Sequence, residues 1–499
     1  MMNMKFLLGI LCLNFLVTGA YATSLSDSTN VSFADIPFHN LTKDSLKILD
    51  IGNSYTTDAT HYIPQITNAA GAIGGYSLYS AVRSSASYKS WVNIYNDCDF
   101  MEYRVNKVAG DEIEGVNAGV GEIGDGVLFR QALERGNWDL IIIHQVSLYA
   151  NDFDLWGGDT AGGYLNELLT ILCETNPQAS IGIYLIHSYR GDYKNNTEGS
   201  SLARWQNVAD AIKKLKLNYG IDFVIPYGTA AQNLRASSLN DEYDFSYDGA
   251  HLSDGIGDYV AACCYWEALL APRFGSIIGN SWRYTNLNEN TAGVKKITDE
   301  TVSFAQKAAV LAMRNMYQLT DVDSFDTYMQ LPAEYVCYDN RIIGYNYNKP
   351  MGCITIPDSI VGITRGVFND CKEVRRLILP AGLRSLGNYA FNNCTAIEAI
   401  TSFIPGDELF PINESVFNGV DKSACTLYVP YGSKEAYTST DGWKDFYNVV
   451  EGDLSDISEI KSDDWNVDTE IVYDMNGRRT KGSTNGIHII NGKKVLVKQ

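Results

Sequence analysis

The sequence predicts an α/β protein that continues into a short repeat region and a strand-rich tail. Short apolar strands alternate with helical patterns over residues 46–319, which is typical of a parallel sheet with helices on both faces. A 23-residue repeat then occupies 353–450, and a hairpin pattern occupies 465–499. A chain of 499 residues is also too long for one ordinary domain, and its length predicts two to four domains.

The strands and helices of the first region follow in order along the chain. Apolar runs bounded by turn residues predict strands at 46–51, 139–143, 181–186 and 222–226. Apolar residues spaced by three or four positions predict helices at 61–72, 126–135, 165–174, 201–219, 257–270 and 298–319. In such a sheet, ligands gather at the carboxyl ends of the strands. Ser54 and Gln145 each lie just after a predicted strand, so we expect them to share a site.

The N-terminus has the pattern of a secretory signal peptide. Lys5 precedes an apolar core over 6–17, and Ala20-Tyr21-Ala22 fits a small-x-small cleavage site. The apolar run is too short for a transmembrane anchor, and no later stretch is apolar enough to span a bilayer. We therefore expect a signal peptide over 1–22, cleavage after Ala22, and a protein that is secreted, periplasmic or bound to the cell surface.

The net charge and the cysteine content limit the classes of partner and ligand that this protein is expected to bind. The net charge of −20 argues against nucleic acid and against anionic membrane surfaces. Nine of the ten cysteines follow the signal peptide, and none of them forms a CxxC pair. The sequence therefore suggests neither a full disulfide framework nor a zinc site. No cluster of histidines or carboxylates has ligand spacing, so we expect neither a metal nor a cofactor.

Two sequence blocks far apart supply the side chains of a hydrolytic triad. Ser54 follows the first predicted strand on a turn where Gly52 allows close approach, which is where hydrolases place a serine nucleophile. His251 follows Asp248 by three residues, with two small residues between them. A serine hydroxyl needs a positioned base, and the base needs an orienting carboxylate. These residues form a triad hypothesis; a surface histidine beside a chance aspartate is the alternative for His251.

Both blocks resemble motifs of the SGNH (GDSL-type) hydrolase superfamily. The likeness covers about 46–317 and consists of Gly52-Asn53-Ser54 near its start, Asp248-Gly249-Ala250-His251 near its end, and the strand-helix alternation between them. The resemblance implies a flavodoxin-like three-layer sandwich with a parallel sheet. It also implies an ester hydrolase in which Ser54 is the nucleophile, His251 is the base and Asp248 orients the imidazole.

Two further blocks depart from the pattern of this superfamily. His144-Gln145-Val146-Ser147 stands in place of Gly-x-Asn-Asp and is similar to the acetylesterase-like branch. The resemblance implies an oxyanion hole made by the backbone N–H of Ser54, the side-chain amide of Gln145 and one more backbone amide. A structural cap is the alternative role for Gln145. The block expected to hold a glycine reads Arg83-Ser84-Ser85-Ala86-Ser87, so we assign the last amide to Ser85 or its neighbour.

The repeat region has a period of 23 residues. Ile354-Thr355-Ile356-Pro357 matches Leu377-Ile378-Leu379-Pro380, and the segment from Gly366 to Cys371 matches that from Tyr389 to Cys394. A looser third unit and a cap follow. This pattern predicts a short leucine-rich-repeat domain over 353–450, and it resembles the repeats common in secreted bacterial proteins. The polar, tyrosine-rich segment 320–352 is expected to be a linker.

The tail over 465–499 reads as a β-hairpin module. Two apolar strands flank the hairpin signal Asn491-Gly492. The tail resembles a shortened form of the C-terminal β-module that some Bacteroidetes secretion systems read. A plain terminal hairpin domain is the alternative.

Two functions of different classes follow from these features. The leading one is a secreted serine esterase that removes small acyl groups, acetyl above all, from carbohydrate. The second is a non-catalytic surface binding or adhesion protein, in which the repeats bind a glycan or protein partner and the hydrolase fold is a vestige. A lipase or thioesterase would use the same triad as the first. The esterase requires the side chains of Ser54 and His251 to lie within hydrogen-bond reach, about 3 Å.

Overall fold

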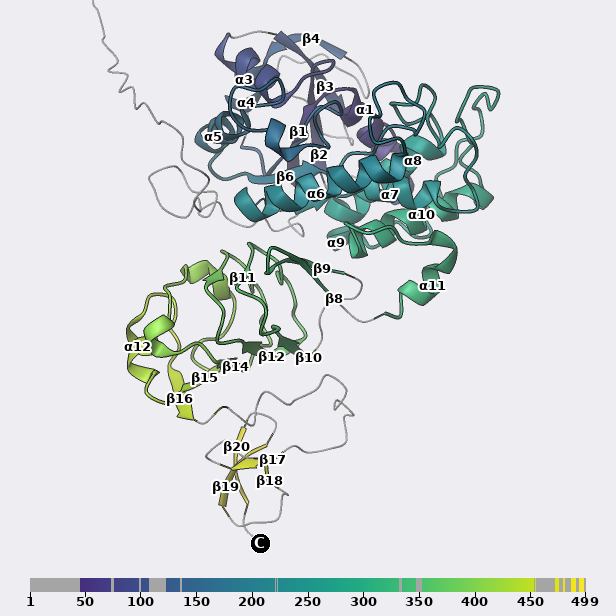
Figure 1. The fold of residues 1–499 in the computed structure, drawn as a ribbon. Helices are drawn as coiled ribbons and strands as arrows, with labels where there is room; N and C mark the ends of the chain where they lie inside the picture. Colours follow the sequence, from purple (N-terminus) through teal and green to yellow (C-terminus); the bar gives the residue numbers. More distant parts are fainter. Residues whose placement is uncertain are drawn as a thin grey trace, which may run out of the picture. The chain divides into compact units, whose positions relative to one another are not determined.

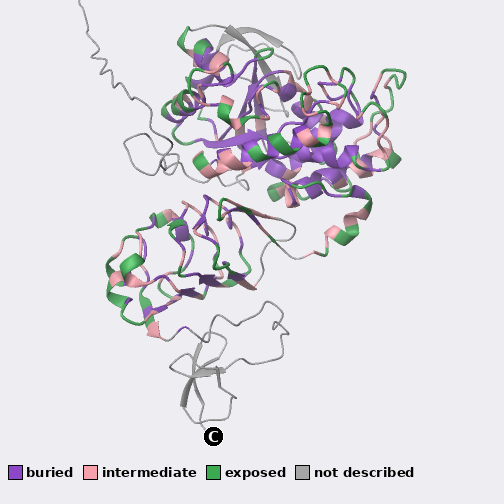
Figure 2. Ribbon diagram, viewed as in Figure 1, coloured by how far each residue is buried: buried purple, intermediate pink, exposed green. Residues whose placement is uncertain are grey.

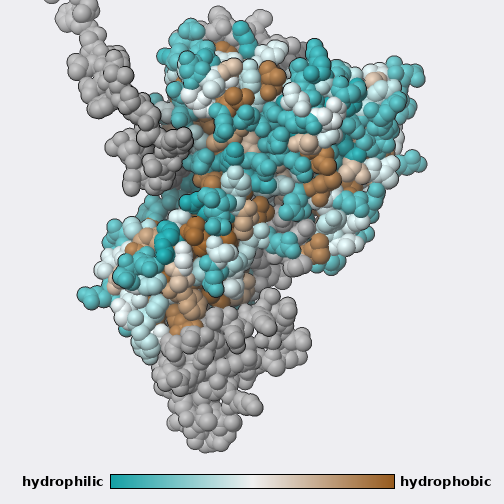
Figure 3. All heavy atoms as spheres, viewed as in Figure 1, coloured by the Kyte–Doolittle hydropathy of each residue, from teal (hydrophilic) through white to brown (hydrophobic). Residues whose placement is uncertain are grey.

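The computed structural model describes residues 45–72, 76–97, 100–106, 123–134, 137–219, 221, 223–331, 334–346, 352–452 and 454, with four strands between 472 and 497. The signal peptide expected at 1–22 and the turn expected at Asn491-Gly492 lie outside these residues. No helix among the described residues is long and apolar enough to cross a membrane. On the face drawn in Figure 3, hydrophilic residues predominate over the α/β region and hydrophobic residues are scattered among them.

A seven-stranded sheet forms the centre of the first region (Figure 1), with the strand order β4-β3-β2-β1-β5-β6-β7. The strands are β1 (Leu46–Gly52), β2 (Tyr76–Val82), β3 (Phe100–Asn106), β4 (Ile123–Leu128), β5 (Leu140–Ile143), β6 (Ser180–Tyr184) and β7 (Phe223–Ile225). Five neighbouring strands of this sheet pair in parallel, in the order β2-β1-β5-β6-β7. Numbered among themselves they run 2-1-3-4-5, which is the flavodoxin-like order. The α/β class and the flavodoxin-like sheet predicted from the sequence are therefore confirmed.

Strands β3 and β4 extend this sheet in a way that the sequence did not predict. β3 pairs antiparallel with β2, and β4 pairs antiparallel with β3. The helix expected from residue 126 begins only at Phe129, because residues 126–128 complete β4. β2 was also missed: its sequence YSLYSAV mixes serines with tyrosines, so it lacks the continuous apolar run of its neighbours.

Helices cover both faces of the sheet (Figure 1). On one face α3, α4 and α5 contact one another, and on the other α1, α2, α7, α8 and α10 form a second layer. The helices are α1 (Ser54–Thr60), α2 (Ile63–Ala69), α3 (Tyr88–Asn96), α4 (Phe129–Glu134), α5 (Leu165–Thr175), α6 (Ser201–Tyr219), α7 (Tyr227–Arg235), α8 (Ile256–Tyr265), α9 (Ala271–Phe274), α10 (Asp299–Arg314) and α11 (Phe325–Tyr328). Helix α6 has the limits predicted from the sequence.

The sheet and the helices on it share one hydrophobic core. All four residues of β5 are buried, and α8 is buried along its whole length. In Figure 2 the buried colour runs through the central strands and through α8. Burial of each leucine or isoleucine side chain contributes about 1.5–3 kcal/mol. The carboxyl ends of the strands are therefore a rigid platform.

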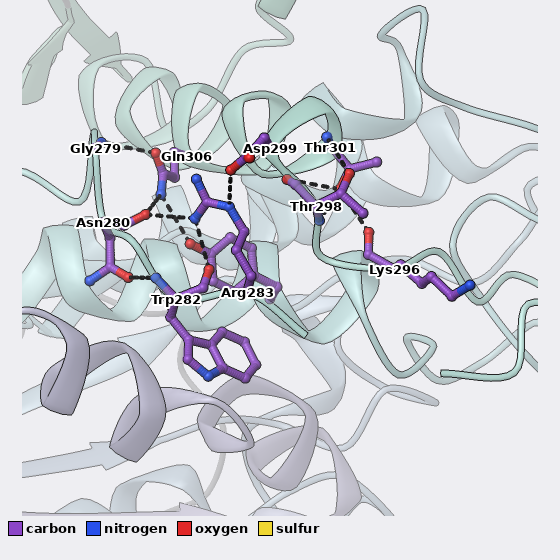
Figure 4. A network of polar contacts seen from close by, with 10 residues as sticks. Gly279, Asn280, Trp282, Arg283, Lys296, Thr298, Asp299, Thr301 and Gln306 are labelled. Carbon is purple, nitrogen blue, oxygen red and sulfur yellow. Dashed lines mark hydrogen bonds and ion pairs between the residues drawn. The ribbon is translucent and has the colours of Figure 1, made fainter. Parts of the chain in front are cut away.

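A polar network fixes the long loop between α9 and α10 (Figure 4). Arg283 binds Asp299 at 2.7 Å and the carbonyl of Asn280 at 2.9 Å. Gln306 of α10 accepts from the N–H of Gly279 and donates to the carbonyl of Asn280. The side chain of Asn280 also donates to the carbonyl of Ile66 in α2. These bonds hold the loop against helices α10 and α2.

The expectation of a linker over 320–352 is wrong for part of this segment. Residues 334–346 form the hairpin of β8 (Glu334–Tyr338) and β9 (Arg341–Asn346). β9 continues a sheet of order β13-β11-β9-β8 with β11 (Gly362–Ile363) and β13 (Ser385–Leu386). Tyrosines that suggested a polar linker lie within these strands, and Tyr335 pairs with Tyr345 across the hairpin.

The repeat region forms a parallel sheet whose first three strands are offset by the sequence period. Its order is β10-β12-β14-β15-β16. The pairs Ile354↔Leu377 and Leu377↔Ile400 each span 23 residues. The strands are β10 (Gly352–Thr355), β12 (Val374–Leu379), β14 (Ala399–Ser402), β15 (Thr426–Pro430) and β16 (Asn448–Gly452), with α12 (Lys434–Ser439) near the end.

Equivalent side chains of successive repeats stack on one another. The Phe368 and Phe391 rings lie 5.2 Å apart and nearly parallel, and Phe391 and Phe417 follow at 5.4 Å. Beside them, Asn392 donates to Asn369, and Asn418 donates to Asn392. Cys371 and Cys394, the small residues of the repeat, are buried. Each repeat thus packs against its neighbour and forms hydrogen bonds with it, as expected for a solenoid.

The tail forms a separate antiparallel sheet of order β18-β17-β19-β20. Its strands are β17 (Val472–Asp474), β18 (Arg479–Thr480), β19 (Gly486–Ile490) and β20 (Lys493–Val497). β19 and β20 form the predicted hairpin, with Ile490 opposite Lys493.

Candidate active site

Ser54 lies at the carboxyl end of the central strand β1, where it begins helix α1. The side-chain oxygen of Asn53 accepts from the N–H of Tyr55 at 3.1 Å and so caps the helix. The Asn53 amide donates to the carbonyl of Ala86 at 3.2 Å. The capped turn fixes the backbone on both sides of Ser54, whose side chain is half-buried. It also ties Ser54 to the loop after β2.

Gly52 is required at the end of β1 because His144 packs directly against it. A Cβ atom at this position would lie 2.1 Å from His144 Nε2 and 2.2 Å from Thr56 Oγ1. His144 Nδ1 donates to the carbonyl of Gln145 at 3.0 Å, so Nε2 accepts from the Thr56 hydroxyl at 2.9 Å. Burial lowers the pKa of His144 to about 4. This histidine is therefore neutral, and it supports the turn that carries Ser54.

The structure brings Ser54, His251 and Asp248 together. His251 Nε2 lies 2.9 Å from Ser54 Oγ, and His251 Nδ1 lies 2.8 Å from Asp248 Oδ2. Asp248 Oδ1 accepts from the N–H groups of Ala250 and His251 at 2.8 and 2.7 Å. Partial burial opposes ionisation of Asp248, but these hydrogen bonds outweigh it and lower its pKa. Since a carboxylate can only accept, His251 Nδ1 is the donor, and Nε2 is free to accept the proton of Ser54.

The turn between Asp248 and His251 depends on Gly249. This residue has a φ of 87°, and the ring of Tyr193 lies 3.0 Å from where a Cβ atom would be. Positive φ is strained for other residues. The glycine between the two triad residues therefore allows the carboxylate to fold back onto the imidazole.

Three aromatic side chains around His251 were not identified from the sequence. Tyr55 and His187 stack at 4.2 Å, and both donate to the carbonyl of Ala250, at 2.6 and 2.8 Å. Tyr247 stacks on His251 at 5.7 Å and is 50% exposed. Burial lowers the pKa of His187 well below its usual value, so this histidine is neutral and holds the His251 loop. The sequence hinted at this arrangement only by placing Tyr55 next to Ser54 and His187 directly after a predicted strand.

Gln145, expected as an oxyanion donor, makes several structural contacts. Its side chain is buried; its amide donates to the carbonyl of Gly162 at 2.6 Å, and its oxygen accepts from the N–H groups of Val146 and Tyr88. These contacts favour the alternative role as a cap, but the bond to Gly162 uses only one of the two amide hydrogens, so the oxyanion role stays a prediction. The local sequence did not indicate the contact with Gly162, because it spans 17 residues.

Ser85 lies on the loop that contacts the Ser54 turn. The N–H of Arg83 donates to the carbonyl of Gly52 at 3.0 Å, and Asn53 binds Ala86 on the other side. Ser85 itself is exposed and has a φ of 56°. The position thus has the left-handed backbone that glycine favours, although the residue is serine. Ser85 therefore adopts the backbone conformation that the missing glycine of this block would have.

Fold and geometry together define an α/β protein of flavodoxin-like topology with a serine, histidine and aspartate joined by hydrogen bonds at the carboxyl end of the sheet. The family model described as "Domain of unknown function (DUF4886)" matches residues 47–301, just over half of the chain. The chain therefore belongs to the DUF4886 family. Residues 344–434 match the BspA type leucine-rich repeat region in six copies, which confirms the repeat prediction.

Several solved structures are similar to this chain. A DUF4886 family protein from Bacteroides uniformis is 25% identical, with 56% of this chain and 99% of that chain covered and a TM-score of 0.44. A candidate SGNH hydrolase from Slackia heliotrinireducens is 18% identical, with 45% and 98% covered and a TM-score of 0.30. A candidate GDSL-like lipase from Parabacteroides merdae is 15% identical, with 47% and 99% covered and a TM-score of 0.31. No curated protein matches the chain significantly.

Proposed function

We propose that this protein is a serine ester hydrolase in which Ser54 is the nucleophile, His251 the general base and Asp248 the residue that orients it. The observation that carries the proposal is the 2.9 Å contact between Ser54 Oγ and His251 Nε2, backed by the 2.8 Å contact between His251 Nδ1 and Asp248. This is the criterion that separates an esterase from a binding protein on a vestigial fold. The geometry supports the esterase.

The proposed reaction follows from the tautomer of His251. Because Nδ1–H is bound to Asp248, Nε2 takes the proton of Ser54 as Oγ attacks the ester carbonyl. The oxyanion of the tetrahedral intermediate would accept from the backbone N–H of Ser54 and of Ser85. His251 then protonates the leaving alcohol, an acyl-enzyme forms on Ser54, and water activated by the same histidine releases the acid.

We propose small acyl esters of carbohydrate, acetyl esters above all, as the substrates. The exposed ring of Tyr247 stands beside His251, and aromatic faces suit the apolar face of a sugar ring. BspA-type repeats over 344–434 are typical of extracellular bacterial proteins, which supports the expected secretion. The expected signal peptide over 1–22 and the tail module stay predictions.

The test is release of acetate or 4-nitrophenol from acetylated xylan and 4-nitrophenyl acetate. We expect activity in the wild type and a loss of at least about 10³-fold in Ser54→Ala, because the nucleophile is gone. Ser439→Ala, which changes an exposed serine of helix α12 in the repeat region, is the matched control and should be fully active. A wild type that is folded but inactive on a broad ester panel would favour the binding protein instead.

A further inference from the structure

A second cluster of ionisable side chains lies near the triad but outside it. Within the described part of the chain, His61, Asp254 and Asp258 form a group whose candidate ligand atoms all lie within 4.8 Å of one another. His61 Nδ1 is 2.7 Å from Asp258 Oδ2 and 3.9 Å from Asp254 Oδ1. His61 directly follows helix α1, and the two aspartates flank the start of α8.

The buried carboxylate of Asp258 is the second observation. Its side chain is only 6% exposed, and its Oδ1 atom is buried with no hydrogen-bond partner among the described residues. His61 satisfies only the other oxygen. A buried carboxylate oxygen without a partner is costly. A simple pair of His61 and Asp258 therefore leaves this oxygen unexplained, whereas a cation coordinated by both carboxylate oxygens of Asp258 would satisfy it.

The backbone around the cluster is held in place. The hydroxyl of Tyr62 accepts from the N–H of Gly255 at 3.1 Å. Gly255 has a φ of 90°, and the carbonyl of Lys295 lies 2.0 Å from where its Cβ atom would be. The N–H of Asp258 donates to the carbonyl of Ser253 at 3.0 Å. The segment that carries both aspartates is thus fixed before any ligand binds.

His61 is oriented from the other side. Its ring stacks on Tyr62 at 4.2 Å, and Tyr62 packs against Trp282 at 4.8 Å. The network of Figure 4 holds Trp282 in turn, since its N–H donates to Asn280. Groups that orient the ligands in this way are typical of metal sites.

We propose that His61, Asp254 and Asp258 bind one divalent cation, with Zn²⁺ as the preferred ion. One imidazole and two carboxylates are suitable ligands for zinc. Tetrahedral zinc with bonds of about 2.0–2.2 Å places its ligand atoms about 3.4 Å apart, between the 2.7 and 3.9 Å observed here. Since His61 and Asp254 are 42% and 63% exposed, water can complete the coordination.

The cation would join two segments that carry the triad. Helix α1 begins at Ser54 and ends next to His61, and Asp254 follows His251 by three residues. The ion would therefore stabilise the placement of both triad segments without touching the reacting atoms. The sequence suggested no metal because His61 lies almost two hundred residues before the two aspartates, so the three ligands do not form a local motif.

The test is calorimetric titration of ZnCl₂ into the full chain, purified without a histidine tag, stripped with EDTA and dialysed. We expect one saturable site and a melting temperature that rises with bound zinc. His61→Ala and Asp258→Asn should each weaken binding at least tenfold. His488→Ala, which removes a histidine of strand β19, should leave it unchanged. Mg²⁺ should bind far more weakly, because one ligand is an imidazole nitrogen.

Three results would overturn the proposal: no saturable binding of Zn²⁺ up to about 1 mM, equal affinity in His61→Ala and the wild type, or equal affinity for Mg²⁺ and Zn²⁺. His61 is exposed, so its alanine variant decides the matter if Asp258→Asn does not fold. None of these readouts depends on esterase activity.

Discussion

Replacement of Gly52 by alanine tests whether the nucleophile turn is built against His144. The new Cβ atom would meet His144 Nε2 at 2.1 Å and Thr56 Oγ1 at 2.2 Å, although real Cβ contacts essentially never fall below 3.0 Å. The histidine or the turn must therefore move by about 1 Å. Both neighbours are buried, so neither side chain can swing into solvent.

The expected cost has two parts. Overpacking of a filled interior costs about 1–3 kcal/mol, and loss of the hydrogen bond between Thr56 and His144 adds about 1 kcal/mol. The sum, about 2–4 kcal/mol, should lower the melting temperature of the α/β domain by about 5–10 °C. Displacement of Ser54 by about 1 Å should also lower kcat about 10²-fold.

Calorimetric melting and ester hydrolysis of Gly52→Ala would measure both effects. Gly157→Ala is the matched control, because nothing lies within 4 Å of its Cβ position and its φ is not positive. We expect this control to stay within about 0.5 kcal/mol of the wild type. A Gly52→Ala protein that melts and turns over like the Gly157→Ala control would refute the role given to His144.

Three more predictions concern Asp50 in the sheet, Ser85 in the oxyanion loop and Asp248 in the triad. Burial raises the pKa of Asp50 from 3.8 to about 8, although Tyr184 donates to its carboxyl group. The contribution of the protonated Asp50 side chain to stability is complete below pH about 4 and is lost as the pH rises through about 8. Asp50→Asn should therefore melt higher than the wild type at pH 9, and the difference in melting temperature should shrink towards pH 4. Ser85→Gly should be at least as stable and as active as the wild type, because glycine relieves the positive φ, whereas Ser85→Pro, which removes the N–H, should lose most activity in the same assay. Asp248→Asn should lower kcat by about 10³- to 10⁴-fold in steady-state kinetics, with little change in melting temperature, because His251 would no longer be held in the correct tautomer; a kcat within tenfold of the wild type would contradict the triad.

The parts of the structure that the sequence predicted are those with a local signal. Strand β5 is a run of four apolar residues, and the repeat region is recognisable by its constant period. The contact between Asp248 and His251 spans only three positions. These features need no knowledge of the rest of the fold, so sequence patterns alone could locate them.

The parts that were missed depend on contacts between distant segments. Gln145 was assigned to the oxyanion hole, and its bond to the loop at Gly162 was not foreseen. Ser85 gave no sign of its left-handed backbone, because serine rarely adopts it. His61 was seen only as the start of a helix, since its partner Asp258 lies 197 positions away. Local patterns do not encode such pairings.

The stacked phenylalanines of the repeat region have a consequence for how its length can change. The stack closes at Phe417, where Trp443 and Phe446 pack across its last ring at 5.9 and 5.5 Å. Between Phe368 and Phe391, by contrast, each unit meets a copy of its own surface. A duplicated block of 23 residues would therefore pack between matching neighbours. The contacts of Trp443 and Phe446 with the last ring would not change. The array can lengthen or shorten by whole units while both ends keep their sequence.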